Sequence, residues 1–254
     1  MEFFVEEGSI VRKIWGKGDT ILFIFAGASA EFALNKAVDW LYFTGRLPAD
    51  PLGRLFSTVS YARQIVFSEK DAAFRAIDKI RAIHTAVESS RGSAIPDWAY
   101  RDVLFMLIHY SIASFEVLER KLNEEEKEEV FAVFYRLGSR MGIPGLPVSY
   151  KTWLTMREDH LNNNLEKSNY TVDLYKQYRK HLGIFRYKLL TEGQILVVPP
   201  QVNHLLGLGK LSLLSPALFF YKGIKKIKLD WFLKSIILPP AYKKQIKDLD
   251  VVAS

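Results

Sequence analysis

The 254-residue chain contains no cysteine. This absence excludes disulfide bonds, thiolate metal sites, a cysteine nucleophile, iron–sulfur clusters and thioether-attached haem. A metal ion would therefore have to be held by carboxylates, by a cofactor or by histidine. The histidines are His84, His109, His160, His181 and His204.

Familiar catalytic motifs are also missing. The sequence has no glycine-rich phosphate loop, no Gly-x-Ser-x-Gly elbow and no His-Glu-x-x-His pair. It also lacks Glu-x-x-His, the signature of di-iron carboxylate bundles. Motif searching alone therefore assigns no reaction to the chain.

Apolar runs long enough to cross a membrane are lacking as well. The apolar stretch Thr20–Ala30 is broken by Glu31, and the stretch Leu205–Tyr221 is interrupted by Lys210 and Pro216. A membrane-spanning helix needs about 20 consecutive apolar residues. We therefore expect no transmembrane segment.

The composition that remains is that of a folded globular protein. Hydrophobic residues make up 49% of the chain and charged residues 25%. The 17 Phe, 12 Tyr and 5 Trp predict a core rich in rings, which suits either ordinary packing or a flat apolar ligand. The first residues include three glutamates, the opposite of a cationic signal peptide, and this predicts a cytoplasmic protein.

The net charge of +7 is unevenly distributed. Lysines and aromatic residues alternate near the C-terminus, a pattern that suits an anionic membrane or nucleic acid but is more often only a solvated surface. Because no nucleic-acid-binding motif accompanies it, we predict no nucleic-acid partner and leave open a peripheral membrane contact through this section. The lysines are Lys222, Lys225, Lys226, Lys228, Lys234, Lys243, Lys244 and Lys247.

Apolar residues at helical spacing, together with capping residues, predict a mainly α fold. We expect one domain over residues 1–254, a helical bundle with a less regular C-terminal section at 191–254. The region 43–54 has the composition of a loop, and Ser68 has the features of a helix N-cap. The predicted helices cover about 69–88, 96–120, 123–142, 149–160 and 171–181.

Two local clusters could carry chemistry. Arg54 and Thr58 are four residues apart and share a face if their segment is helical. Arg81, His84 and Glu88 are three and four residues apart and share one face of the next predicted helix. Taken alone, such clusters are more often a surface arginine and a hydrogen-bonded core histidine.

The order of several short motifs resembles the DUF2236 family, which includes the rubber oxygenase (latex-clearing protein) and mpaB-type oxygenases. The resemblance covers roughly residues 14–153. It begins with Trp15 and an apolar helix at 22–34. The further matching segments are Asp50-Pro51-Leu52-Gly53-Arg54-Leu55-Phe56-Ser57-Thr58, His84-Thr85-Ala86-Val87, Ala99-Tyr100-Arg101-Asp102-Val103-Leu104 with His109, and Gly142-Ile143-Pro144.

The resemblance implies a haem-b oxygenase that uses dioxygen to cleave a carbon–carbon double bond of an apolar, isoprenoid or lipid-like substrate. It implies that His84 is the proximal iron ligand and that Arg54 and Thr58 are catalytic residues in the distal pocket. His109, in an apolar helix, could line the cofactor pocket or be a hydrogen-bonded core histidine. An axial histidine needs an acceptor for its second ring nitrogen, and Glu88 or a backbone carbonyl could supply one.

The sequence also departs from the family. Ser57 stands where the rubber oxygenase has a lysine that can bind the iron, so the distal position should be empty or water-bound. Ser89 replaces a glycine, and the catalytic carboxylate could be either Glu31 or Asp39. These departures leave a second hypothesis, a non-catalytic protein that binds apolar ligands without haem. The other three histidines receive no role, and the oligomeric state is not indicated.

Overall fold

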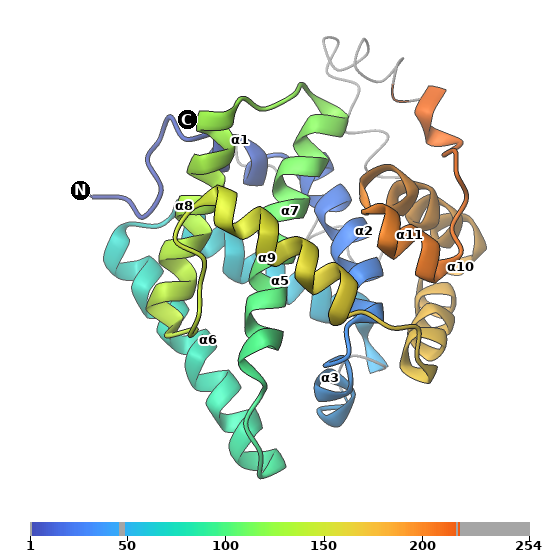
Figure 1. Ribbon diagram of the computed structural model, residues 1–254, viewed down its shortest axis with the longest axis horizontal. Coiled ribbons are helices and arrows are strands. Elements are labelled where there is room, and N and C mark those ends of the chain that lie inside the picture. Colours follow the sequence, from blue (N-terminus) through green and yellow to red (C-terminus); the bar gives the residue numbers. More distant parts are fainter. Residues whose placement is uncertain (1, 46–48, 217, 219–254) are drawn as a thin grey trace.

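The computed structural model describes residues 2–45, 49–216 and 218, and these residues form α-helices without strands (Figure 1). The prediction of a mainly α fold is confirmed. The helices are α1 (Ile10–Trp15), α2 (Gly18–Leu34), α3 (Asp39–Phe43), α5 (Pro51–Phe67), α6 (Lys70–Arg91), α7 (Asp97–Leu118), α8 (Glu124–Met141), α9 (Tyr150–Asn163), α10 (Asn169–Val197) and α11 (Pro200–Leu206).

Helix α2 lies at the centre of the bundle, between α7 and α10 (Figure 1). Its side chains are apolar almost all round, and helices of this kind are buried on every side. The backbones of α2 and α7 come close at Gly27, where a Cβ atom would lie 2.1 Å from the Tyr110 ring. None of the described helices is long and apolar enough to span a membrane.

Helix α8 shows how local sequence sets the boundaries of an element. Asn123 and Glu126 form a reciprocal capping box, and Gly142 ends the helix with a left-handed φ of 76°. The side chains Val130, Phe134 and others on one face are buried against α1, α6 and α7. The predicted helix at 123–142 is therefore confirmed at both ends.

Two predicted boundaries near α5 and α6 are wrong. The segment expected to be a loop up to residue 54 is helical from Pro51, because the Asp50 side chain caps the helix by accepting from the Gly53 N–H at 2.8 Å. Ser68 does not cap α6. It is the extended residue that ends α5, and Glu69 stands at the N-cap of α6 without a side-chain cap.

The C-terminal part is more regular than the sequence predicted. The helix expected to end at His181 continues to Val197, with a kink at Gly183 (φ 72°, ψ 170°), and α11 follows. The section expected to be irregular from residue 191 therefore begins with helix. The basic and aromatic residues after 218 lie outside the described residues.

Candidate functional site

The first turns of α5 position Arg54 and Thr58. The guanidinium of Arg54 donates to the Thr58 hydroxyl at 2.8 Å, one helical turn further along. Ser57 is exposed, and its hydroxyl donates to the Arg54 carbonyl at 2.7 Å. The segment is helical, so Arg54 and Thr58 share a face as their spacing predicted, and the structure adds a direct contact between them.

His84 lies on α6, which packs beside α5, and its side chain is half-buried. Burial lowers the pKa of His84, the nearby Arg54 charge lowers it further, and Glu88 opposes the shift. The Nδ1 atom is shielded from solvent and has no hydrogen-bond partner. At neutral pH, His84 is thus an uncharged imidazole with unused bonding capacity.

Glu88 was one of two candidates, beside a backbone carbonyl, for the acceptor of the His84 ring, and in the structure it bonds to other groups. One Glu88 oxygen accepts from the Ile95 N–H at 2.9 Å and from the Tyr100 hydroxyl at 3.1 Å. Ile95 lies in the connection between α6 and α7, and Tyr100 lies at the start of α7. The carboxylate at the end of α6 therefore bonds to both the connection and the following helix. The Tyr100 ring lies against His84, with 5.2 Å between the ring centroids.

A buried charged network, missed by the sequence analysis, surrounds Glu31 on α2. This carboxylate has no solvent exposure, and both of its oxygens are paired with the two terminal nitrogens of Arg157. It also accepts from Tyr110 at 2.7 Å and lies 2.8 Å from His160 Nε2. Burial alone would raise the pKa of Glu31, but Arg157 and His160 hold it well below its ordinary range.

The network continues through His160 to Asp102. The second ring nitrogen of His160 lies 2.7 Å from Asp102, which also accepts from the side chains of Asn35 (3.1 Å) and Asn164 (3.0 Å). Burial lowers the pKa of His160, but Asp102 and Glu31 outweigh this effect and raise it. His160, to which the sequence assigned no role, thus bridges the Glu31 carboxylate on α2 and the Asp102 carboxylate on α7.

Asp39, the other carboxylate considered for catalysis, lies in a different environment. It forms an ion pair of 2.6 Å with Arg91, whose guanidinium stacks over the Trp40 ring at 3.9 Å. Arg91 is in the last turn of α6, so Asp39 is held next to the helix that carries His84. Unlike Glu31, Asp39 is part-exposed.

His109 belongs with the buried network. The charges that act on it are those of Arg157 and Glu31, and its Nε2 atom is buried without a partner. Burial, reinforced by Arg157, lowers the pKa of His109 to about 4. The groups that shift its pKa thus differ from those that act on His84.

The lowered pKa of His109 predicts acid destabilisation. Between pH 6.5 and about 4, only the unfolded chain binds a proton at this residue. The free energy of unfolding therefore decreases as the pH is lowered through this range, by up to about 3 kcal/mol. In His109→Gln this contribution should vanish. Urea unfolding of both proteins from pH 7 to 4 measures the difference, with His204→Gln at an exposed position as the control. Parallel pH profiles for wild type and His109→Gln would contradict the assignment.

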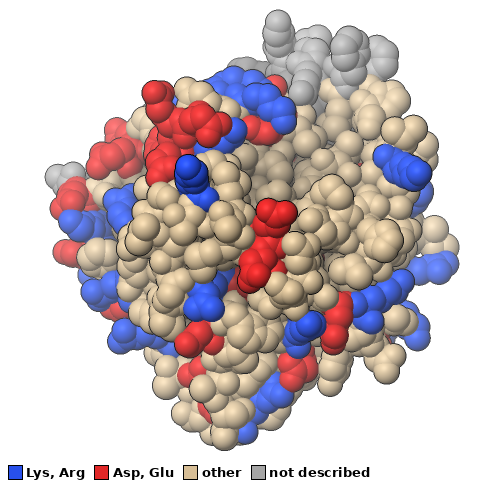
Figure 2. Space-filling view, in the orientation of Figure 1, with Lys and Arg blue, Asp and Glu red and all other residues tan. Residues whose placement is uncertain are grey.

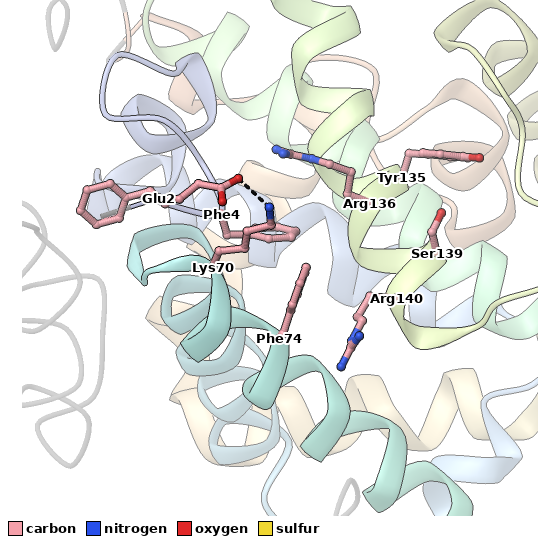
Figure 3. A pocket seen from close by; sticks show the side chains of 9 residues that line it. Glu2, Phe4, Lys70, Phe74, Tyr135, Arg136, Ser139 and Arg140 are labelled. Carbon is pink, nitrogen blue, oxygen red and sulfur yellow. Dashed lines mark hydrogen bonds and ion pairs between the residues drawn. The ribbon is translucent and has the colours of Figure 1, made fainter.

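Two surface cavities lie away from these residues. One, of about 460 Å³, lies between the chain start, α6 and α8, and Figure 3 shows its lining of phenyl rings and cationic side chains such as Phe74 and Arg136. The other, of about 420 Å³, lies where α9 meets α11. Neither is lined by His84, Arg54 or Thr58.

The comparison with protein families identifies the class of this protein. Residues 13–220 match the family described as ER-bound oxygenase mpaB/B'/rubber oxygenase, catalytic domain, so the chain belongs to this family of oxygenase domains. No curated protein and no solved structure matches it significantly. Within the described residues, no cluster of three or more His, Asp or Glu side chains is placed to hold a metal ion.

Proposed function

We propose that the protein is a haem-b-dependent oxygenase that acts on an apolar, isoprenoid or lipid-like substrate. The observation that supports this best is His84. It is an uncharged imidazole with a shielded ring nitrogen that has no partner, on a helix packed beside the one that presents Arg54 and Thr58. A single neutral imidazole on a helix is a common axial ligand of haem iron, and such a site needs no cluster of metal ligands.

Each of these residues would have a distinct task. When bound, the haem would supply a redox-active iron that activates dioxygen for oxidative cleavage of a carbon–carbon double bond. His84 would hold the iron, and Tyr100 would restrict the orientation of the His84 ring. Arg54, oriented by its 2.8 Å bond to Thr58, would help to hold the cofactor by donating hydrogen bonds to a propionate, or would donate them to dioxygen.

Ser57 bears on the number of protein ligands. Its hydroxyl is exposed and already donates to the Arg54 carbonyl, and a neutral hydroxyl is a poor ligand for iron. We therefore propose that His84 is the only side chain of this pair of helices that binds the iron.

One observation favours the second hypothesis, a haem-free protein that binds apolar ligands. Axial histidines almost always donate their other ring N–H to a carboxylate, carbonyl or water, which fixes the ring. In the described part of the chain, Nδ1 of His84 has no such acceptor, because Glu88 bonds elsewhere. The two hypotheses differ in one visible property, the colour of the protein.

The test is the absorbance spectrum of protein purified after expression with added haem precursor and iron. The wild type should show a Soret band, and His84→Ala should retain less than about one tenth of the haem. His204→Ala, an exposed histidine, serves as the matched control and should remain fully loaded. Circular dichroism confirms that each variant is folded.

A colourless wild type that takes up no added haemin, yet binds an apolar fluorescent probe, would support the haem-free hypothesis. Full haem content in folded His84→Ala would remove His84 as the ligand.

A further inference from the structure

The second half of α10 exposes large apolar side chains where the helix bends. Directly after the kink at Gly183, Ile184 is 74% exposed and Phe185 is 62% exposed. Two adjacent apolar residues exposed to this extent contribute nothing to the core. Isolated apolar residues are common on protein surfaces, but grouped ones mark a site of interaction.

A loop beyond α11 also exposes large apolar side chains. Leu211 is 87% exposed and Leu213 is 74% exposed. The loop is fixed to α10, because the Leu213 N–H donates to the Glu192 carboxylate at 2.6 Å and Ser212 donates to the Glu192 carbonyl at 3.0 Å. Phe185 and Glu192 are seven residues apart and share a helix face, so the loop is docked along the face that carries Phe185.

The charges in the segment that carries this surface are almost all positive. Segment 179–213 contains one carboxylate, Glu192, and that carboxylate is neutralised by Lys188 at 2.7 Å. Figure 2 shows mainly Lys and Arg side chains along the right-hand edge of the molecule, where α10 lies. The cations of the segment are Arg179, Lys180, Arg186, Lys188 and Lys210.

We propose that this surface, the face of α10 around Ile184 and Phe185 together with Leu211 and Leu213, docks on an anionic lipid membrane. Apolar side chains would enter the headgroup boundary while the surrounding cations contact lipid phosphates and carboxylates. Lysine and arginine stems suit this arrangement, since they extend along apolar surface and keep their charge in water. The proposal does not depend on haem. If the proposed function also holds, the surface brings the enzyme to the phase in which apolar substrates dissolve.

The absence of cysteine allows a site-specific test. Ile184→Cys and the control Val148→Cys each give a unique attachment point for an environment-sensitive fluorophore such as NBD. Val148 is 79% exposed but lies in the connection between α8 and α9, away from α10 (Figure 1). With vesicles of phosphatidylcholine and 30% phosphatidylserine, emission at position 184 should shift to shorter wavelength, and emission at 148 should not.

Co-sedimentation with the same vesicles supplies the second readout. Phe185→Ser should weaken binding at least tenfold without changing the circular dichroism spectrum, and Val148→Ser should bind as the wild type does. Binding should also decrease in 0.5 M salt and on pure phosphatidylcholine.

Three results would overturn the proposal. A probe at 184 that is already blue-shifted without vesicles would mean that another part of the chain covers this surface. A blue shift that grows with protein concentration alone would indicate a second copy as the partner. Equal vesicle binding by Phe185→Ser and wild type would place any membrane contact elsewhere.

Discussion

Replacing Arg157 with methionine should lower the free energy of unfolding by about 3–5 kcal/mol, because it leaves the Glu31 carboxylate buried without its cation. Urea unfolding followed by circular dichroism measures this loss. How this loss of stability changes with pH shows whether the unpaired charge of Glu31 causes it. In the wild type the lowered pKa of Glu31 contributes stability above pH 4.5 that is lost on acidification. In Arg157→Met the buried carboxylate favours its protonated form, so the deficit should shrink as pH falls.

Two control variants separate this effect from the loss of any arginine. Arg120 also forms a two-bond pair with a glutamate, Glu126, at 2.7 and 2.6 Å, but on the surface, and Arg120→Met should change stability little. The double variant Glu31→Leu with Arg157→Met removes both buried charges and should recover part of the loss. A deficit in Arg157→Met that does not vary with pH would show that packing, rather than charge, causes it.

Gly27→Ala should lower the free energy of unfolding by about 1–3 kcal/mol, although alanine favours a helix over glycine by about 1 kcal/mol. The added Cβ would lie 2.1 and 2.2 Å from two atoms of the Tyr110 ring. That ring is fully buried, and its hydroxyl is held by Glu31, so it cannot move aside without breaking the network. Relief of the clash would require α2 and α7 to separate.

Gly193→Ala is the matched control for Gly27→Ala. Gly193 is also a buried glycine within a helix, and a Cβ there meets only the Ala26 Cβ at an ordinary 3.5 Å. This variant should be neutral or more stable by up to about 1 kcal/mol. The two glycines should therefore respond with opposite signs in the same urea titration. Equal stability of Gly27→Ala and wild type would show that the α2–α7 contact adjusts freely.

The elements that sequence predicted well are those decided by neighbouring residues. The capping box of α8 and its terminal Gly142 need only a few residues of context, and both ends were predicted. The prediction was less accurate at α10, where the helix was expected to end at His181. In the structure α10 continues through Gly183 with a kink, and beyond the kink only its last turns are buried, at Glu192, Gly193, Gln194 and Val197.

In the candidate site, too, contacts within one helix could be predicted from the sequence and contacts between segments could not. That Arg54 and Thr58 share a helix face follows from their spacing, and the structure confirms it. The partner of Glu88 could not be predicted from helix spacing, since both donors come from beyond the next turn. Helix geometry puts Glu88 one turn from His84 but does not decide which group bonds to it.

The buried network was missed because it joins segments far apart in sequence, although one signal was present. Glu31 is the only charged residue in the interior of an otherwise apolar helix, and buried carboxylates are almost always paired. Arg157 and His160 lie three residues apart on one face of α9, which makes them a suitable pair of partners. Sequence alone could not show which cation pairs with Glu31.

Glu31 and Arg157 are separated by 126 residues, a distance with a consequence for the order of folding events. The carboxylate cannot shed its hydration shell until α9 has arrived, and α9 becomes available only after most of the chain has been traversed. Closing so long a loop is entropically slow. We therefore expect the desolvation of Glu31 to come late in folding.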